Sequence, residues 1–208
     1  MKPSAFDWKP VTGTVILAAA LWFGTFYLDW GVFWYKIAAS ALILAALSFL
    51  LQPKGQLRFT LSLKTIGLGL VSAGLLYLIF WAGKTASTAL LPFAGDQIGS
   101  IYGKGEGTPT WRIALLLFFV TSPCEEIYWR GYLQKKLMTR FGGVGGWLLA
   151  TIFYAGVHIW SLNFILIGAA AVAGAFWGGM YGRLNDLSPV IISHAIWSTF
   201  IFAVMPIA

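Results

Sequence analysis

The sequence predicts an all-α fold, a polytopic bundle of about seven transmembrane helices with a range of six to eight. Of the 208 residues, 59% are hydrophobic and only 10% are charged, whereas soluble domains carry about 25% charged residues. The apolar residues form long blocks and do not alternate with polar ones. Most of these blocks reach the length of about 17 to 20 residues that a helix needs to cross a bilayer. An integral membrane protein is therefore expected.

Seven apolar blocks give the expected helices in chain order. They cover residues 13–28, 31–51, 65–82, 111–120, 143–160, 164–181 and 189–207. The fourth block is too short to span a membrane unless its helix continues through the charged stretch SPCEEIYWRGYL, which begins at Ser122. The first block is expected to remain as a helix, because no small-x-small cleavage site with a polar start follows it.

The basic residues predict how the chain is oriented and argue against a nucleic-acid partner. The net charge is +7, and six basic residues fall between expected helices: Lys54, Arg58, Lys64, Lys135, Lys136 and Arg140. Cytoplasmic loops of membrane proteins carry such an excess of Lys and Arg. The N-terminus and these loops are therefore predicted to be cytoplasmic, with a loop at 84–109 outside. No basic surface studded with aromatic residues remains for nucleic acid.

The 84–109 segment divides one membrane domain into two parts. Residues 1–109 hold three helices and the external loop, with almost no charge inside the helices. Residues 110–208 contain nearly every polar residue that falls within an apolar block, so the catalytic core is expected there. The single cysteine, Cys124, excludes an internal disulfide and is expected to have a packing role, because neighbouring carboxylates suppress its thiolate.

Four ionisable residues mark this second part as functional. The only two histidines, His158 and His194, and two of the seven acidic residues, Glu125 and Glu126, lie within or at the end of apolar blocks. Ionisable side chains in transmembrane segments generally mark functional sites. The alternatives are a charge cluster at the membrane edge and histidines that only hydrogen-bond in the core.

Counting residues predicts which of these side chains meet. If Gly142 is the turn of a helical hairpin, Glu126 lies sixteen residues before it and His158 sixteen after it. At about 1.5 Å per residue both lie roughly 24 Å from the turn, at the same depth. His194 follows Pro189 by only five residues. Either the turn before it is sunk into the protein or its helix begins deep, and both alternatives stay open.

The spacing of the charged residues favours hydrolytic chemistry. Arg130 stands four residues after Glu126, where helical side chains meet, so a Glu126–Arg130 pair is expected and Glu125 is left free for chemistry. A glutamate can take a proton from water, one histidine can orient the water or bind a metal, and a second can stabilise the developing oxyanion.

The charged stretch carries the first motif of a known family. Glu125-Glu126-Ile127-Tyr128-Trp129-Arg130 is similar to the Glu-Glu-x-x-x-Arg motif of the CPBP family. These are the CAAX-protease and bacteriocin-processing membrane proteins, also called the abortive-infection family, and they resemble the CAAX prenyl endopeptidase. The Gly and Leu that usually follow the motif are present at 131 and 133.

Two further motifs follow in the order and spacing of that family, so the resemblance covers residues 111–200. Tyr154-Ala155-Gly156-Val157-His158 resembles Phe-x-x-x-His, with Tyr in place of Phe. His194 is followed four residues later by Ser198, where the family has Asn. The Tyr keeps the aromatic ring and is expected to have a mild effect. Ser198 replaces an amide donor that helps to hold the oxyanion in the family.

The resemblance implies an intramembrane endopeptidase. Glu125 corresponds to the general base, His158 to the residue that orients the water, and His194 with Ser198 to the oxyanion site. Glu126, also in the catalytic motif, and Arg130 would support the site, as would Tyr154. The runner-up function is a membrane adaptor of the same fold that binds partner helices without cutting them.

Cofactor, partners and location are expectations of the same kind. A metal-free glutamate mechanism is favoured because no His-x-x-x-His pair is present; the alternative is zinc held by Glu125, His158 and His194. The expected partners are the lipid bilayer and a membrane-tethered peptide or protein substrate. The short loops favour a prokaryotic plasma membrane.

Overall fold

The computed structural model describes residues 7–53 and 55–207, and within them the regular elements are helices. The α-helices are α1 Trp8–Phe26, α2 Phe33–Leu50, α3 Leu63–Leu90, α4 Ala94–Gly103, α5 Thr110–Leu116, α6 Ser122–Glu126, α7 Lys135–Val157, α8 Phe164–Leu184 and α9 Ser188–Thr199. Short π-helical elements are η1 Leu117–Thr121, η2 Ile127–Gln134 and η4 Phe200–Val204, and η3 His158–Ser161 is a 3-10 turn. The all-α prediction is confirmed.

The number of long apolar segments also agrees with the sequence. Five helices are long and apolar enough to span a bilayer, and one of them, Thr110–Ser161, runs through 52 residues. This helix departs from helical geometry at Gly142. With its two arms counted separately, and with the shorter apolar helix Ser188–Val204, the described residues supply seven segments.

The charged stretch lies inside a continuous helix. Residues 110–141 run from α5 through η1, α6 and η2 into the first part of α7 without a non-helical residue, so the short fourth block does continue as predicted. The π-helical turns stand directly before and after the two glutamates. Such turns are rare and are frequent at functional sites.

Gly142 is the turn of the predicted hairpin. Its φ of 78° and ψ of 170° lie in a region that glycine adopts without a steric penalty. Beyond it, the second arm of α7 packs back against the first. At Gly146 the arms approach so closely that a Cβ atom would overlap backbone atoms of Met138. Because a backbone cannot rotate away as a side chain can, this contact requires glycine.

Gly146→Ala is therefore expected to destabilise the hairpin by about 1–3 kcal/mol or more, the usual cost of overpacking. The measurement is the midpoint of thermal unfolding of the purified protein in detergent. Gly143→Ala is the matched control, since a Cβ there meets no atom within 4 Å. Equal midpoints for the two variants would show that the arms do not pack as described.

The expectation of a loop at 84–109 is wrong for most of that segment. α3 runs on to Leu90, and α4 occupies Ala94–Gly103. The hydroxyls of Thr85, Ser87 and Thr88 bond to carbonyls three or four residues earlier, which satisfies them inside the helix. Tertiary contacts that local sequence does not reveal hold α4, including hydrogen bonds from Asn163 to its main chain and side chains.

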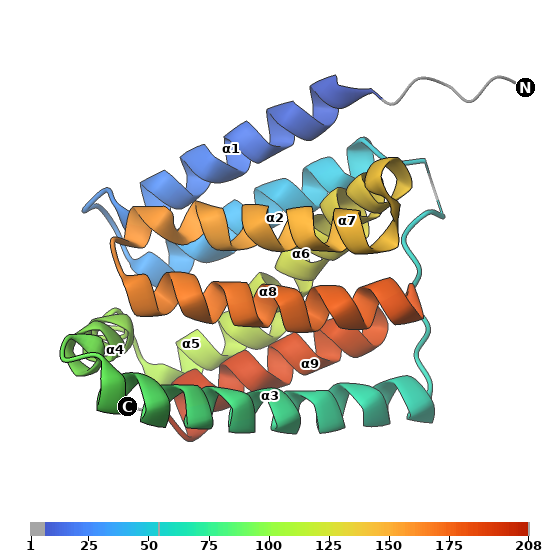
Figure 1. Ribbon diagram of the computed structural model, residues 1–208. Coiled ribbons are helices and arrows are strands. Elements are labelled where there is room, and N and C mark those ends of the chain that lie inside the picture. The colour runs from blue at the N-terminus through green and yellow to red at the C-terminus, as the bar shows by residue number, and fades with distance from the viewer. Residues whose placement is uncertain (1–6, 54, 208) are drawn as a thin grey trace, which may run out of the picture.

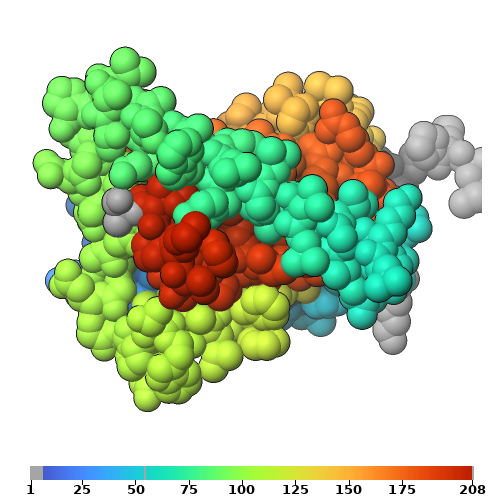
Figure 2. Space-filling model, turned by 90° about the horizontal axis from the view of Figure 1, so that it is seen from below, coloured from blue at the N-terminus to red at the C-terminus, as the bar shows by residue number. Residues whose placement is uncertain are grey.

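The helices lie roughly side by side, and their connections gather at the two ends of the bundle (Figure 1). The 51–62 connection and the α8–α9 turn lie at one end; α4 and the α1–α2 turn lie at the other. Seen from below, α9 and the C-terminal residues fill the space between α3 and the 110–125 segment (Figure 2). The basic residue Lys54 lies outside the described residues, and the predicted cytoplasmic side stays a prediction.

The turn before His194 is covered only in its second half: residues 182–185 are exposed, whereas Asp186 and Leu187 are buried. The Leu187 amide donates to the carbonyl of Arg58 at 2.9 Å. The Asp186 carboxylate accepts the amide of Thr60 at 3.2 Å and lies 3.7 Å from Nε of Arg58. The 58–60 segment thus covers the start of α9, and the depth of His194 in a membrane stays a prediction with both alternatives open.

Candidate active site

A cavity of about 520 Å³ brings most of the predicted site residues together. Its lining is mainly aliphatic and aromatic and includes Glu125, Tyr154, His158, His194 and Ser198. These side chains come from α6, the second arm of α7, η3 and α9, which are far apart in the sequence. A carboxylate and two imidazoles therefore share one mostly apolar chamber.

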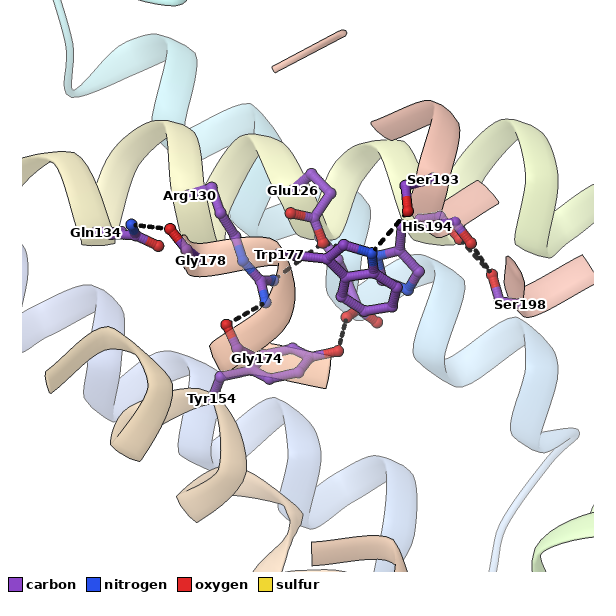
Figure 3. Close-up of polar contacts among 12 residues, drawn as sticks. Glu126, Arg130, Gln134, Tyr154, Gly174, Trp177, Gly178, Ser193, His194 and Ser198 are labelled. Atoms are coloured by element: carbon purple, nitrogen blue, oxygen red, sulfur yellow. Dashed lines mark hydrogen bonds and ion pairs between the residues drawn. The ribbon is translucent and has the colours of Figure 1, made fainter. Parts of the chain in front are cut away.

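Glu126 lies behind this chamber and forms the predicted ion pair. Its Oε1 is 3.0 Å from a guanidinium nitrogen of Arg130 and 2.7 Å from Nδ1 of His194 (Figure 3). Glu126 is fully buried and Arg130 is 1% exposed. Arg130 also donates to the Gly174 carbonyl at 3.5 Å and lies over the rings of Tyr154 and Trp177. The ion pair is thus surrounded by protein groups and shielded from solvent.

His194 is fixed in position by two contacts. The carboxylate of Glu126 only accepts hydrogen bonds, so Nδ1 of His194 carries a proton and donates it. The ring stacks on Trp177 with a centroid distance of 3.8 Å and an interplanar angle of 21°. The Trp177 indole is held in turn by a hydrogen bond to the Ser193 hydroxyl at 3.2 Å. Nε2 is the ring nitrogen that remains for chemistry.

Glu125 is held by one of its two oxygens. The Tyr154 hydroxyl donates to Oε2 of Glu125 at 3.0 Å. Both residues are buried, with 6% of each exposed. Glu125 and Glu126 thus have separate partners, as their angular offset on a helix predicts.

Both ring nitrogens of His158 have hydrogen-bond partners. Nδ1 lies 2.7 Å from the carbonyl of Tyr154, an acceptor, so Nδ1 carries the proton. Nε2 is then an acceptor, and the indole N–H of Trp22 in α1 donates to it at 3.4 Å. His158 is neutral in this arrangement, and its one acceptor lone pair is used by Trp22 until that long hydrogen bond is released.

The equal-depth count stays a prediction. The Tyr154 hydroxyl, from a residue four positions before His158, contacts Glu125, and His158 lines the same cavity as Glu125. The first arm contains the π-helical element η2 between Glu126 and Gly142, so its rise differs from that of a regular α-helix.

Ser198 lines the cavity, but its hydroxyl is used within the protein. It donates to the His194 carbonyl at 2.6 Å and lies 2.8 Å from the hydroxyl of Ser122. A role for Ser198 in oxyanion binding stays a prediction and requires the hydroxyl to turn away from that carbonyl.

The side chains named for zinc do not form a ligand set in this arrangement. Among the residues that the structure describes, no three His, Cys, Asp or Glu side chains are grouped closely enough to hold a metal ion. In addition, Nε2 of His158 already accepts the Trp22 indole. The chemistry described for this site therefore uses no metal ion.

Residues 107–200 match the family described as type II CAAX prenyl endopeptidase Rce1-like. This part of the chain is therefore similar to the Rce1-like family. The matched range holds all seven predicted site residues: Glu125, Glu126, Arg130, Tyr154, His158, His194 and Ser198. No curated protein and no solved structure matches the chain.

The Rce1-like match and the apolar helices together indicate an integral membrane protein that is similar to a family of endopeptidases. Trp22, which touches His158, lies outside the matched range. Helix α1 thus contributes to the site, although no motif predicts a site residue there.

The motifs of the Rce1-like family do not include Trp22 or Trp177, and we did not predict either as a site residue. The sequence around each of these tryptophans nevertheless indicates a buried role. Trp22 stands inside an apolar span, where an indole N–H needs an internal partner. Trp177 stands in the glycine-rich stretch GAFWGGMYG, which indicates close helix packing around a large ring.

Proposed function

We propose that the protein is an intramembrane endopeptidase in which Glu125 activates water to hydrolyse a peptide bond. The observation that carries this proposal is the convergence of Glu125, His158 and His194 on one apolar-lined cavity. The similarity of residues 107–200 to the Rce1-like family supports it independently.

In the proposed reaction Glu125 acts first as a base and then as an acid. Glu125 takes a proton from a water in the cavity, and the water oxygen adds to the peptide carbonyl carbon. His158 orients this water through Nε2 once the 3.4 Å hydrogen bond from the Trp22 indole is released. The carbonyl oxygen becomes an oxyanion, which His194 stabilises. As the carbon–nitrogen bond breaks, Glu125 passes the proton to the leaving amine. To donate from Nε2, His194 must carry a second proton, and the Glu126 carboxylate at 2.7 Å is the counter-ion for that charge.

The substrate that this cavity fits is a membrane-associated peptide or protein. The lining is dominated by residues such as Phe33, Phe80, Ile98 and Phe202, which offer an apolar chain a surface like that of the bilayer. The excess of basic residues in the loops favours a cytoplasmic N-terminus. The short loops favour a prokaryotic plasma membrane. Leader peptides and C-terminal membrane anchors are the candidate substrates.

We expect cleavage to survive metal chelation. Purified protein is treated with a chelator, dialysed, and assayed before and after zinc is added. Because no proposed step uses a metal, the rate should stay within about twofold of the untreated protein. A loss of activity that zinc restores would establish a metalloenzyme and contradict the roles given above.

The test of the proposed function is the appearance of a processed product in membranes. Membrane proteomes of cells with and without the protein are compared for new peptide termini. We expect specific cleaved products that depend on the protein. Identical proteomes, combined with co-purification of intact membrane proteins, would instead identify an adaptor.

A further inference from the structure

We propose that the hydroxyl group of Tyr154 positions the Glu125 carboxylate for proton transfer. This inference rests on the proposed function and adds a residue that acts through the base. The expectation from the sequence was only that Tyr in place of Phe keeps the ring. In the structure the added hydroxyl bonds directly to the proposed base, at 3.0 Å from Oε2 of Glu125.

The ring of Tyr154 is held rigidly, so its hydroxyl has a defined direction. Arg130 lies over one face with 4.6 Å between guanidinium carbon and ring centroid. Trp129 meets the ring edge-on at 5.2 Å. Gly174 faces the ring so closely that a Cβ there would lie 2.9 Å from Cδ1 of Tyr154. The ring therefore fills a slot shaped by these three residues.

The direction of the hydrogen bond follows from its chemistry. A phenol has one proton to give, and an ionised carboxylate can only accept. The bond fixes one oxygen of Glu125 and restricts rotation of the carboxylate, which leaves Oε1 to meet the water. A hydrogen bond to a charged group is among the stronger kinds in proteins, so its loss is measurable.

Tyr154 also connects the base to the first imidazole. Its main-chain carbonyl accepts Nδ1 of His158 at 2.7 Å, while its side chain donates to Glu125. One residue thus sets both the orientation of the base and the tautomer of His158. Replacing Tyr with Phe removes the hydroxyl contact alone, because the main chain and the ring remain.

The test is the steady-state kinetics of Tyr154→Phe with a membrane-anchored peptide reporter that the wild-type protein cleaves. We expect kcat to fall about tenfold while KM stays within about twofold. The matched control is Tyr128→Phe, which removes another buried tyrosine hydroxyl, one that does not bond to Glu125 and does not line the cavity. Rates are normalised to folded, monodisperse protein, so that a loss of fold does not count as a loss of turnover.

The outcomes separate this inference from the proposed function. Unchanged or higher kcat in Tyr154→Phe, with Glu125→Gln inactive, overturns the positioning role alone. Equal falls for Tyr154→Phe and Tyr128→Phe also overturn it, because they reflect a general effect of removing a buried hydroxyl. Full activity in Glu125→Gln overturns the proposed function itself.

Discussion

Glu125→Gln is expected to abolish cleavage, with kcat lower by about a hundred- to ten-thousandfold, the range that a general base contributes. Glutamine keeps the size of the side chain, and its amide oxygen can still accept the Tyr154 hydroxyl. It cannot take a proton from water. The fold should therefore persist while the chemistry is lost, which is measured by comparing reporter cleavage with thermal unfolding of the same preparation.

The matched control for this variant is Glu106→Gln. Glu106 is exposed, lies between α4 and α5, and does not line the cavity. The same change of a carboxylate to an amide at that position should leave kcat unaltered. Retention of cleavage by Glu125→Gln at the rate of Glu106→Gln would remove Glu125 from the role of base.

The second large effect is expected at Glu126. Glu126→Gln leaves the guanidinium of Arg130, which is 1% exposed, without its counter-charge. Breaking a buried ion pair from one side costs about 3–5 kcal/mol. A strong fall in the yield of folded protein and in its unfolding midpoint is therefore expected. Cleavage should fall as well, because Nδ1 of His194 loses the carboxylate 2.7 Å away.

A double variant shows whether the charge or the side chain matters. Glu126→Gln combined with Arg130→Met removes both members of the pair, so no uncompensated charge stays buried. We expect it to regain much of the stability that the single variant loses, yet to cleave poorly, because His194 still lacks a charged partner. If the single and double variants unfold at the same temperature, the pair does not carry the energy assigned to it.

Apolar blocks and local spacing predicted the parts of the fold that depend on nearby residues. The seven segments follow from block length, and the turn at Gly142 follows from the conformational freedom of glycine. The Glu126–Arg130 pair follows from the four-residue spacing on one helix. In each case the deciding interaction lies within a few residues or one helical turn.

The sequence did not predict which distant segments contact each other. Residues 58–60 form hydrogen bonds with Asp186 and Leu187 before α9, and nothing in either stretch of sequence indicates that the two meet. The π-helical turns around Glu125 and Glu126 leave no periodicity in the sequence that distinguishes them from α-helix. They change the rise of the first arm, so a count at a constant rise per residue does not give its exact register.

The sequence also did not show how a substitution within a motif changes the hydrogen bonds of the site. Tyr154 differs from the family residue by one oxygen atom, and that atom bonds to Glu125. Ser198 keeps a donor in its motif position, but the donor is directed to the carbonyl of His194. The direction of a hydroxyl depends on which acceptors surround it: for Tyr154 the acceptor comes from another helix, and for Ser198 it is a carbonyl of its own helix.

The central claim is that water enters this cavity and is added across a peptide bond by Glu125. The most direct measurement uses membranes from cells that lack the protein, incubated with the purified protein in water enriched in oxygen-18. Mass spectrometry then reads the newly formed C-termini. We expect new termini that carry one solvent oxygen and that are absent when Glu125→Gln replaces the wild type. New termini without the label, or equal labelling with Glu125→Gln, would contradict the claim.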